Sequence, residues 1–238
     1  MSVELGFAVT PSGHERWDSR AYIPRHRHER AYAALILAGS YEESGSRGRF
    51  HVRPGDVLLH DAFDAHLDRF QSGGARIFSL AMEAWPAATG IAHLRDVDAV
   101  VRVAERDAIE AAALLHAEIR CKPLVHYDWP DILAEDLLSD PGCRLEEWAR
   151  TRSLAPTSVS RGFRNVFGIS PAAFRLDARA RHAFRLITRS RLSFVAIAAA
   201  TGFADQAHMC RAIRALTGAT PGHWRRSNSF KTAAASCA

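Results

Sequence analysis

The chain has 238 residues, enough for one large or two small domains, and its formal net charge of +5 averages two unlike parts. Residues 143–226 contain fifteen arginines and four acidic residues, a net charge of +11, whereas residues 1–142 carry a net charge of −7. Only the C-terminal part is suited to bind a polyanion. No apolar run reaches the roughly 18 residues that span a bilayer and no signal peptide is evident, so we expect a cytoplasmic protein with no membrane partner.

Residues 1–85 have the pattern of short β-strands. Apolar or alternating runs are separated by glycine-containing turns, among them Pro54-Gly55-Asp56. This spacing is typical of a small antiparallel sandwich or barrel, so we predict an N-terminal antiparallel β-barrel domain over residues 1–95. The predicted strands are Tyr32 to Leu37, Phe50 to Val52, Val57 to Leu59 and Ile77 to Leu80.

Residues 97–120 place apolar side chains on one face at a helical period, and Pro123 follows where a helix would end. We predict one amphipathic helix here. Its apolar face has two candidate partners, the barrel and the same helix of a second chain, and the sequence does not choose between them. Residues 96–142 are therefore interpreted as a helical linker and candidate dimerisation segment, with a homodimer as the expected assembly.

Beyond residue 130 the pattern is helical. Breaks at Asp140-Pro141-Gly142 and at Gly168 separate successive helices. The predicted fold class is therefore α+β and multidomain, with an all-α C-terminal domain over residues 143–226. Residues 227–238 have little apolar surface to bury and are predicted to form a flexible tail. The helices are expected over 131–138, 145–152, 156–167 and 172–190, with a further helical set over 193–226.

Residues 145–175 repeat as residues 195–225, at a shift of fifty positions with no gap. Both copies place two arginines, three residues apart, at equivalent positions of a short helix. Both also close with a similar segment, Gly168-Ile-Ser-Pro in the first and Gly218-Ala-Thr-Pro in the second. One structural unit is therefore used twice.

Each copy has the pattern of a helix-turn-helix unit: a brace helix, a tight turn, and a second helix with one apolar and one polar face. The alternative, a helical bundle with solvated arginines, explains neither the repeat nor the segregation of charge. The predicted inward residues are Val159, Phe163, Val166, Met209, Ile213 and Leu216, and the predicted DNA-facing residues are Thr157, Ser160, Arg161, Arg164, Gln206, Ala207, His208, Arg211 and Arg214.

Four segments carry a family pattern: L-E-E-W-A (145–149), S-R-G-F-R-N-V-F-G-I-S-P-A-A-F (160–174), I-A-A-A-T-G-F-A-D-Q-A-H (197–208) and G-A-T-P-G-H-W-R (218–225). In these segments the chain resembles the C-terminal domain of the AraC/XylS family of bacterial transcription regulators. The resemblance implies a sequence-specific regulator that binds double-stranded promoter DNA and has RNA polymerase as a further partner. The base contacts it implies are those of Thr157, Ser160, Arg161, Gln206, Ala207 and Arg211.

The chain departs from the family pattern at the first recognition helix. Ala155 stands where the family usually has a helix-capping serine, and Gly162 lies inside the helix, which it weakens. Since Ser160 and Ala207 are small, the specificity of base reading is expected to rest mainly on Arg161, Gln206 and Arg211.

Family members commonly place a cupin-like barrel before the DNA-binding domain, and the N-terminal segment resembles one. Metal-binding cupins have an H-x-H pair, an acid four residues later and a histidine on a later strand; the matching residues are His26, His28 and His66, with Tyr32 in the acid's place. Two histidines separated by one residue lie on the same face of a strand, so both can point into a barrel.

The resemblance implies one transition metal ion, with zinc as the first expectation and iron as the alternative. Alternatively, His26 and His28 line an effector pocket or face water. Glu29, Asp61 and Asp64 are candidates for a fourth ligand, and nothing in the sequence ranks them.

Two functions from different classes remain. The first is a transcription regulator, not an enzyme, whose barrel senses a small molecule or a metal ion. The alternative is a metal-dependent cupin enzyme, such as an oxygenase, with an appended DNA-binding domain. The alternative leaves the basic repeat unexplained, so the sequence favours the regulator.

Overall fold

The computed structural model describes residues 7–8, 12–82, 90–140 and 142–234. The chain forms two compact units. The first comprises residues 1–135 and 159–168 and contains the β-sheet, and the second comprises residues 136–158 and 169–238 and is helical. The predicted fold class, an antiparallel β domain followed by an all-α region, is confirmed.

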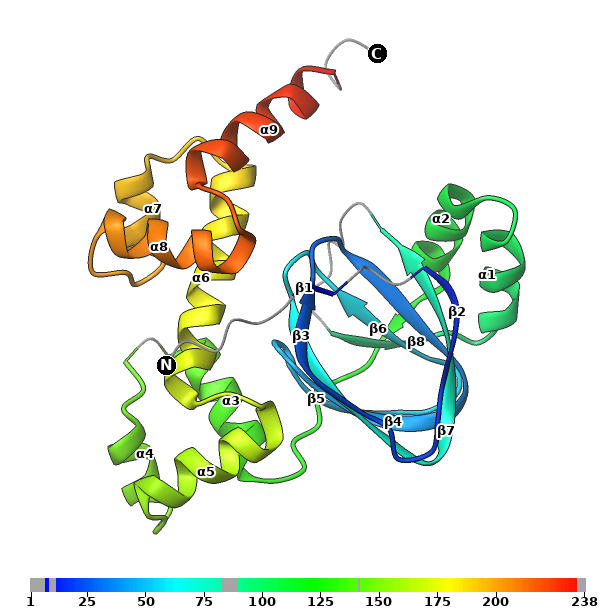
Figure 1. The fold of residues 1–238 in the computed structure, drawn as a ribbon, viewed down its shortest axis with the longest axis horizontal. Coiled ribbons are helices and arrows are strands. Elements are labelled where there is room, and N and C mark those ends of the chain that lie inside the picture. Colours follow the sequence, from blue (N-terminus) through cyan, green and yellow to red (C-terminus); the bar gives the residue numbers. More distant parts are fainter. Residues whose placement is uncertain (1–6, 9–11, 83–89, 141, 235–238) are drawn as a thin grey trace. The chain divides into compact units, whose positions relative to one another are not determined.

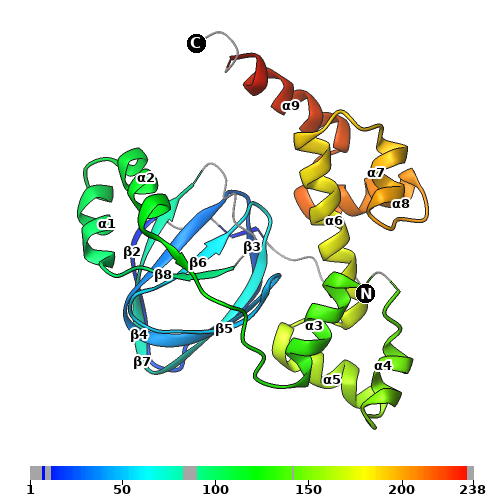
Figure 2. The same cartoon turned by 180° about the vertical axis from the view of Figure 1, so that it is seen from behind.

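The strands of the first unit curl around a common interior (Figures 1 and 2). They form one sheet in the order β1-β3-β7-β4-β6-β8-β9, with β2 on β7 and β5 on β4. The pairings are antiparallel except that of β1 with β3. The strands are β1 (Phe7–Ala8), β2 (Gly13–Trp17), β3 (Tyr22–His28), β4 (Tyr32–Gly45), β5 (Gly48–Val52), β6 (Asp56–His60), β7 (Ala65–Ala81), β8 (Ile91–His93) and β9 (Arg120–Cys121).

Two of the predicted strands are parts of much longer ones. The apolar run that ends at Leu37 continues as β4 to Gly45, because register shifts on either side of Gly39 bend the strand without ending it. Gly39 has φ +75°, and a Cβ there would lie 2.0 Å from the carbonyl oxygen of Gly74, so only glycine fits.

Alternation along β4 sorts its side chains between two apolar clusters. Ala33 and Leu35 contribute to a cluster that also contains Val100 and Leu115, whereas Ile36 belongs to a second cluster with aromatic residues. Since neighbouring side chains of a strand point to opposite faces, one face of the sheet packs against helices and the other fills the barrel. The second cluster includes Tyr32, Tyr41, Phe50, Phe70 and Ile77.

The segment predicted as a single helix over 97–120 is two helices, α1 (Val97–Ala104) and α2 (Ala108–Glu118). The side chain of Asp107 accepts hydrogen bonds from the backbone N–H groups of Ile109 and Glu110, which starts a new helix there. The apolar periodicity runs through the break because both helices bury residues in the same cluster on the sheet. Of the two candidate partners for this face, the structure has the barrel (Figure 2).

A buried ion pair fixes the chain just before the C-terminal helices. Arg49 of β5 donates from Nε and Nη2 to the two carboxylate oxygens of Asp131, at 3.0 and 2.7 Å. Asp131, in the first turn of α3 (Trp129–Ser139), also accepts the backbone N–H of Tyr127 at 2.8 Å. The carboxylate therefore ties the start of this helix to β5 with charge-assisted hydrogen bonds.

The C-terminal helices begin and end close to the predicted positions. Residues 227–234 of the predicted flexible tail continue the last helix, residues 235–238 lie outside the described residues, and the flexibility of the tail stays a prediction. None of the helices in the described parts of the chain has both the length and the apolar character needed to cross a membrane. The helices are α4 (Leu145–Thr151), α5 (Pro156–Phe167), α6 (Pro171–Arg189), α7 (Phe194–Ala200), α8 (Gln206–Thr217) and α9 (Pro221–Ala234).

The packing of α2 predicts a large difference between two substitutions on one helix. Leu115 is fully buried against the sheet, whereas 84% of Ile109 is exposed. Leu115→Ala should lower the free energy of unfolding by about 2–5 kcal/mol, because it removes buried methyl groups and leaves a cavity. Ile109→Ala should change it by no more than about 0.5 kcal/mol. Urea unfolding followed by circular dichroism measures both, and equal effects would contradict the packing described.

Candidate functional site

The second predicted helix-turn-helix unit is α7 followed by α8, packed with α9 on α6 (Figure 1). Met209, Ile213 and Leu216 of α8 are buried, as the sequence predicted. The indole N–H of Trp224 in α9 donates to the Thr217 hydroxyl at 2.7 Å. The inward face of α8 is thus fixed by apolar packing and by this hydrogen bond.

Local residues set where α8 begins and ends. Gly202, with φ +73°, makes the turn after α7, and the Asp205 side chain accepts the backbone N–H of His208 at 2.6 Å as the N-cap. Gly218 ends the helix in the left-handed conformation with φ +76°. The cap and the glycines hold the first turn of α8 in place, and this turn carries Gln206.

The outward face of α8 matches the predicted DNA-facing set with one exception. Gln206, Ala207, Arg211 and Arg214 are exposed, and three of them line one hollow of the surface together with Cys210 and Pro221. His208 is half-buried, because its ring packs edge-on against Phe203 at a centroid distance of 5.1 Å. Its ring thus supports the turn, while the two arginines and the glutamine remain available to a ligand.

The corresponding helix of the first copy, α5, has one corrected inward position. Val159, Phe163 and Phe167 are buried, and the last two rings stack at 4.6 Å. Val166, predicted to point inward, is only half-buried, since the larger Phe167 ring takes the inward place one residue later. On the outward side, Thr157, Arg161 and Arg164 are exposed and Ser160 is half-buried.

In the barrel, strand register brings the predicted metal ligands together. His26 of β3 lies directly opposite His66 of β7, and Tyr32 of β4 lies opposite His60 of β6. The Nε2 atoms of His26 and His28 are 3.1 Å apart, and the ligand atoms of the His26, His28 and His66 side chains lie within 4.8 Å of one another. The distances suit three nitrogen ligands converging on one ion.

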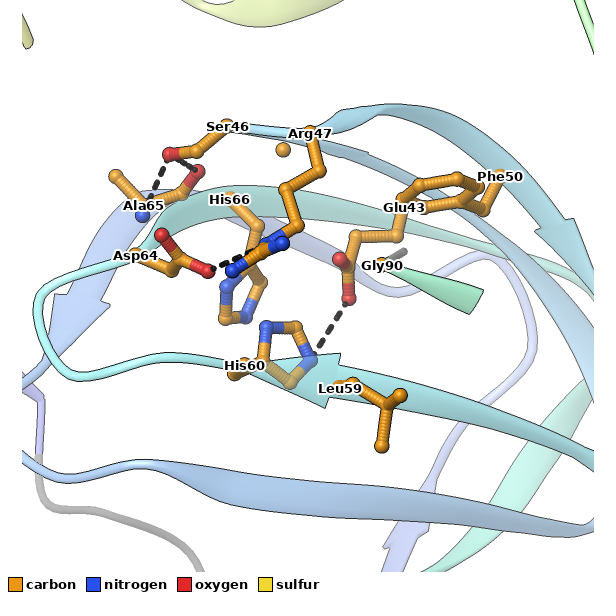
Figure 3. Close-up of a pocket in the computed structure, with 11 residues that line it drawn as sticks. Glu43, Ser46, Arg47, Phe50, Leu59, His60, Asp64, Ala65, His66 and Gly90 are labelled. Carbon is orange, nitrogen blue, oxygen red and sulfur yellow. Dashed lines mark hydrogen bonds and ion pairs between the residues drawn. The ribbon is translucent and has the colours of Figure 1, made fainter. Parts of the chain in front are cut away.

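The structure adds two residues that the sequence analysis missed. Glu43 and His60 form a second group with His66, again with ligand atoms within 4.8 Å of one another (Figure 3). Glu43 falls in the polar part of β4, beyond the predicted strand end at Leu37, and His60 directly follows the predicted strand 57–59. Alternation along β4 was the only available signal, and the bend at Gly39 hid it.

The three candidates for a fourth ligand have other surroundings. Asp61 and Asp64 both form ion pairs with Arg47. Figure 3 shows that of Asp64, whose carboxylate lies 3.3 Å from Nε. Glu29 is exposed. Tyr32, which stands where metal-binding cupins have an acid, places its hydroxyl 3.4 Å from Nε2 of His66.

Burial sets the protonation of this cluster. It lowers the pKa of His66 well below its ordinary value and that of His60 to about 3, so both imidazoles are neutral with a nitrogen lone pair free to bind a cation. Burial, together with the charge of Asp68, raises the pKa of the Glu43 carboxyl. Nδ1 of His66 and Nε2 of His60 form no hydrogen bond with the described residues, although the latter lies 3.5 Å from the Glu43 carboxylate, so both are placed to bind a metal ion.

Residues 148–227 match the family model described as "Helix-turn-helix domain". The chain is 31% identical over 90 residues to the arabinose operon regulatory protein of Escherichia coli (38% of this chain, 31% of the relative). It is 40% identical over 78 residues to the transcriptional regulator GlxA of Rhizobium meliloti (33% and 24%), and 32% identical over 84 residues to the activator VirF of Yersinia enterocolitica (35% and 31%). The C-terminal region is an AraC-type helix-turn-helix domain. The chain spans less than a third of the length of each of these relatives.

Two solved structures are also similar to this chain. The DNA-binding domain of AdpA, solved in complex with a target DNA, is 22% identical, covers 42% of this chain and 91% of its own, and gives a TM-score of 0.38. ToxT of Vibrio cholerae O395 is 8% identical, covers 90% and 95%, and gives a TM-score of 0.41.

One departure of this AraC-type domain has a structural reason. A Cβ at Gly162 of α5 would lie 2.5 Å from the ring of Trp129. The glycine, which weakens the helix, lets the indole pack directly on the helix backbone.

The lowered pKa of His60 predicts how the metal-free barrel responds to acid. Because the unfolded chain takes up a proton at about pH 6.5 and folded His60 does so only at about 3, stability is lost as pH falls through this window. In chelator-treated protein, His60→Gln should make the loss shallower between these pH values. His51→Gln, at an exposed position, is the control, and urea midpoints measured across pH would contradict the prediction if the two variants behaved alike.

Proposed function

We propose that the protein is a sequence-specific transcription regulator that binds double-stranded promoter DNA through α5 and α8. The observation that carries this proposal is the outward face of α8, where exposed Gln206, Arg211 and Arg214 lie opposite a buried apolar face in an AraC-type domain. The net charge of +11 over residues 143–226 supplies the attraction to the phosphate backbone.

The outward side chains of α8 have different roles in DNA binding, which follow from their chemistry. Arg211 can donate two hydrogen bonds to guanine and Gln206 can pair with adenine, which reads sequence in the major groove. Arg214 lies farther along the helix and contacts phosphate, which positions the helix without reading a base. Arg161 and Arg164 of α5 play the equivalent parts in the first copy. Since the two helices differ in their other outward residues, they read different half-sites.

The barrel is proposed as the sensor, of the cupin type, with one transition metal ion held by His26, His28 and His66. Zinc is the first expectation and iron the alternative. When bound, the ion would act as a Lewis acid that links the histidines of β3 to the histidine of β7. The protein's own part is to hold three imidazoles, from β3 and β7, within reach of one point.

The wider partners follow from the same proposal. A homodimer and contact with RNA polymerase stay predictions, and a dimer would need a surface other than the apolar face of α1 and α2, which the barrel covers. The alternative, a metal-dependent cupin enzyme, is not favoured, because the relatives matched are named as regulators and an enzyme leaves the basic repeat unused.

Two arginines three residues apart should differ in a DNA titration. Arg211→Ala should weaken binding to the cognate promoter by about 1–3 kcal/mol and relax the preference at one base position. Arg214→Ala should weaken binding to all sequences alike and reduce the dependence of log K on log[salt] by about one unit, since a phosphate contact is lost. Fluorescence anisotropy with specific and scrambled duplexes at several salt concentrations measures both.

The control is Arg106→Ala, which removes an exposed arginine between α1 and α2. It should leave both the affinity and the salt dependence unchanged. Full affinity in both α8 variants, or equal losses in all three, would mean that α8 does not read DNA.

The metal proposal predicts about one transition metal ion per chain in protein purified without chelator. His26→Ala/His28→Ala should lose the ion, and the thermal stabilisation by added Zn²⁺ should vanish with it. Elemental analysis and thermal unfolding give the two readouts. Wild-type protein that carries no metal and is equally stable with and without Zn²⁺ would remove the metal while leaving the DNA-binding proposal intact.

A further inference from the structure

Three residues from three different strands meet at one end of the barrel interior: Glu43 of β4, His60 of β6 and His66 of β7 (Figure 3). We propose that Glu43 and His60 bind a metal ion together with His66. The carboxylate ligand of the site then comes from β4. This inference rests on the proposed function in one respect, that the barrel binds a divalent metal ion.

Strand geometry holds the three side chains together. Glu43 is paired with Asp68, two residues beyond His66 on β7, so the alternation of the two strands sets Glu43 and His66 on the same face. Gly45, directly opposite His66, leaves the space between them open: a Cβ there would lie 3.3 Å from both the Glu43 carboxylate and the His66 side chain. A larger residue at this position would push the two ligands apart.

The space they surround has the size of one small ion or one water molecule. A cavity of about 10 Å³ is lined by Glu43, His60 and His66, with Arg47 and Phe50 among its other walls. This is about the volume in which one water-sized sphere can move, far below the about 300 Å³ or more of a pocket for an organic ligand. The occupant that matches both the size and the nitrogen and oxygen donors is a single metal cation.

Charge supports the same assignment. Three neutral imidazoles would leave the two positive charges of a divalent ion without compensation in a low-dielectric interior, which is costly. The Glu43 carboxylate, 4% exposed, lies 3.5 Å from Nε2 of His60, with Asp68 opposite on β7. Neighbouring Glu42, on the other face of β4, is instead engaged by Arg49 and Arg69. The strand thus presents one acid to arginines and the other to histidines.

The ligand set indicates the class of metal. Imidazole and carboxylate together suit borderline divalent ions such as Zn²⁺, Fe²⁺ and Co²⁺, and the described residues of the cluster offer no thiolate for a soft ion such as Cu⁺. The site is therefore one for a divalent ion, and Co²⁺ is a suitable spectroscopic probe for it.

The test measures the binding of Co²⁺ and Zn²⁺ to the full chain by competition with a chromophoric chelator, together with the visible absorption of the Co²⁺ form. Glu43→Gln and His60→Gln should each weaken binding by at least about 100-fold, since even residues that only orient ligands contribute about 10- to 100-fold. Each should also shift the d–d bands of bound Co²⁺, because a ligand has changed. Circular dichroism and thermal unfolding without metal show that the variants are folded.

Glu42→Gln and His51→Gln are the matched controls, because they make the same chemical changes at residues that pair with each other, at 3.2 Å, away from the cluster. They should keep wild-type affinity and wild-type spectra. If Glu43→Gln and His60→Gln also do so while His26→Ala/His28→Ala loses the ion, the inference is wrong and the proposed triad stands. If wild-type protein binds neither ion but binds DNA, both metal proposals are wrong, the triad and the Glu43 and His60 ligands, and the proposal of a DNA-binding regulator stands.

Discussion

The pairing of β4 with β7 along almost their whole length is the constraint on which the first unit depends. Because side chains alternate along both strands, this one register decides which residues face the helices and which face the interior. A slip of one residue would turn Leu35 away from the helices and into the barrel, and would move Glu43 away from His66. The apolar core and the ligand cluster are therefore specified together, and neither can be rearranged without the other.

The interior of the barrel is divided by polarity as a result. Aromatic residues such as Tyr41 and Phe70 fill one part of it, and the histidines and acids gather in another, where the ring of Tyr32 stacks on His60 at 4.3 Å. Buried polar groups of this number are costly unless they are satisfied, and the arginine Arg47 satisfies Asp61 and Asp64. Nδ1 of His66 has no hydrogen-bond partner among the described residues, and Nε2 of His60 lies 3.5 Å from the Glu43 carboxylate, beside a cavity of about 10 Å³.

The sequence allowed the helical half to be predicted closely, because its signals are local. Helix periodicity, caps and glycine stops lie within a few residues of one another, and the repeat supplies the apolar periodicity and the glycine stops twice. The barrel depends on pairings between distant residues, such as His26 with His66, and on the bend at Gly39, which no local pattern shows. The break at Asp107 was missed for the converse reason: tertiary packing keeps one apolar face across two helices, so periodicity alone indicates a single one.

Regulation requires more than an ion that stabilises the barrel. A ligand changes DNA binding only if it favours one arrangement of the chain over another. A ligand that binds both arrangements with equal affinity changes nothing, however tightly it binds. The first unit contains an element on which such a preference can act. The segment of β4 that carries Glu43 pairs with β5, and Arg49 of β5 holds Asp131 at the start of α3. Position alone does not establish coupling. It does specify one route to test: for a change at Glu43 to reach α3 through β5, it would have to alter the hydrogen bonds between Arg49 and Asp131.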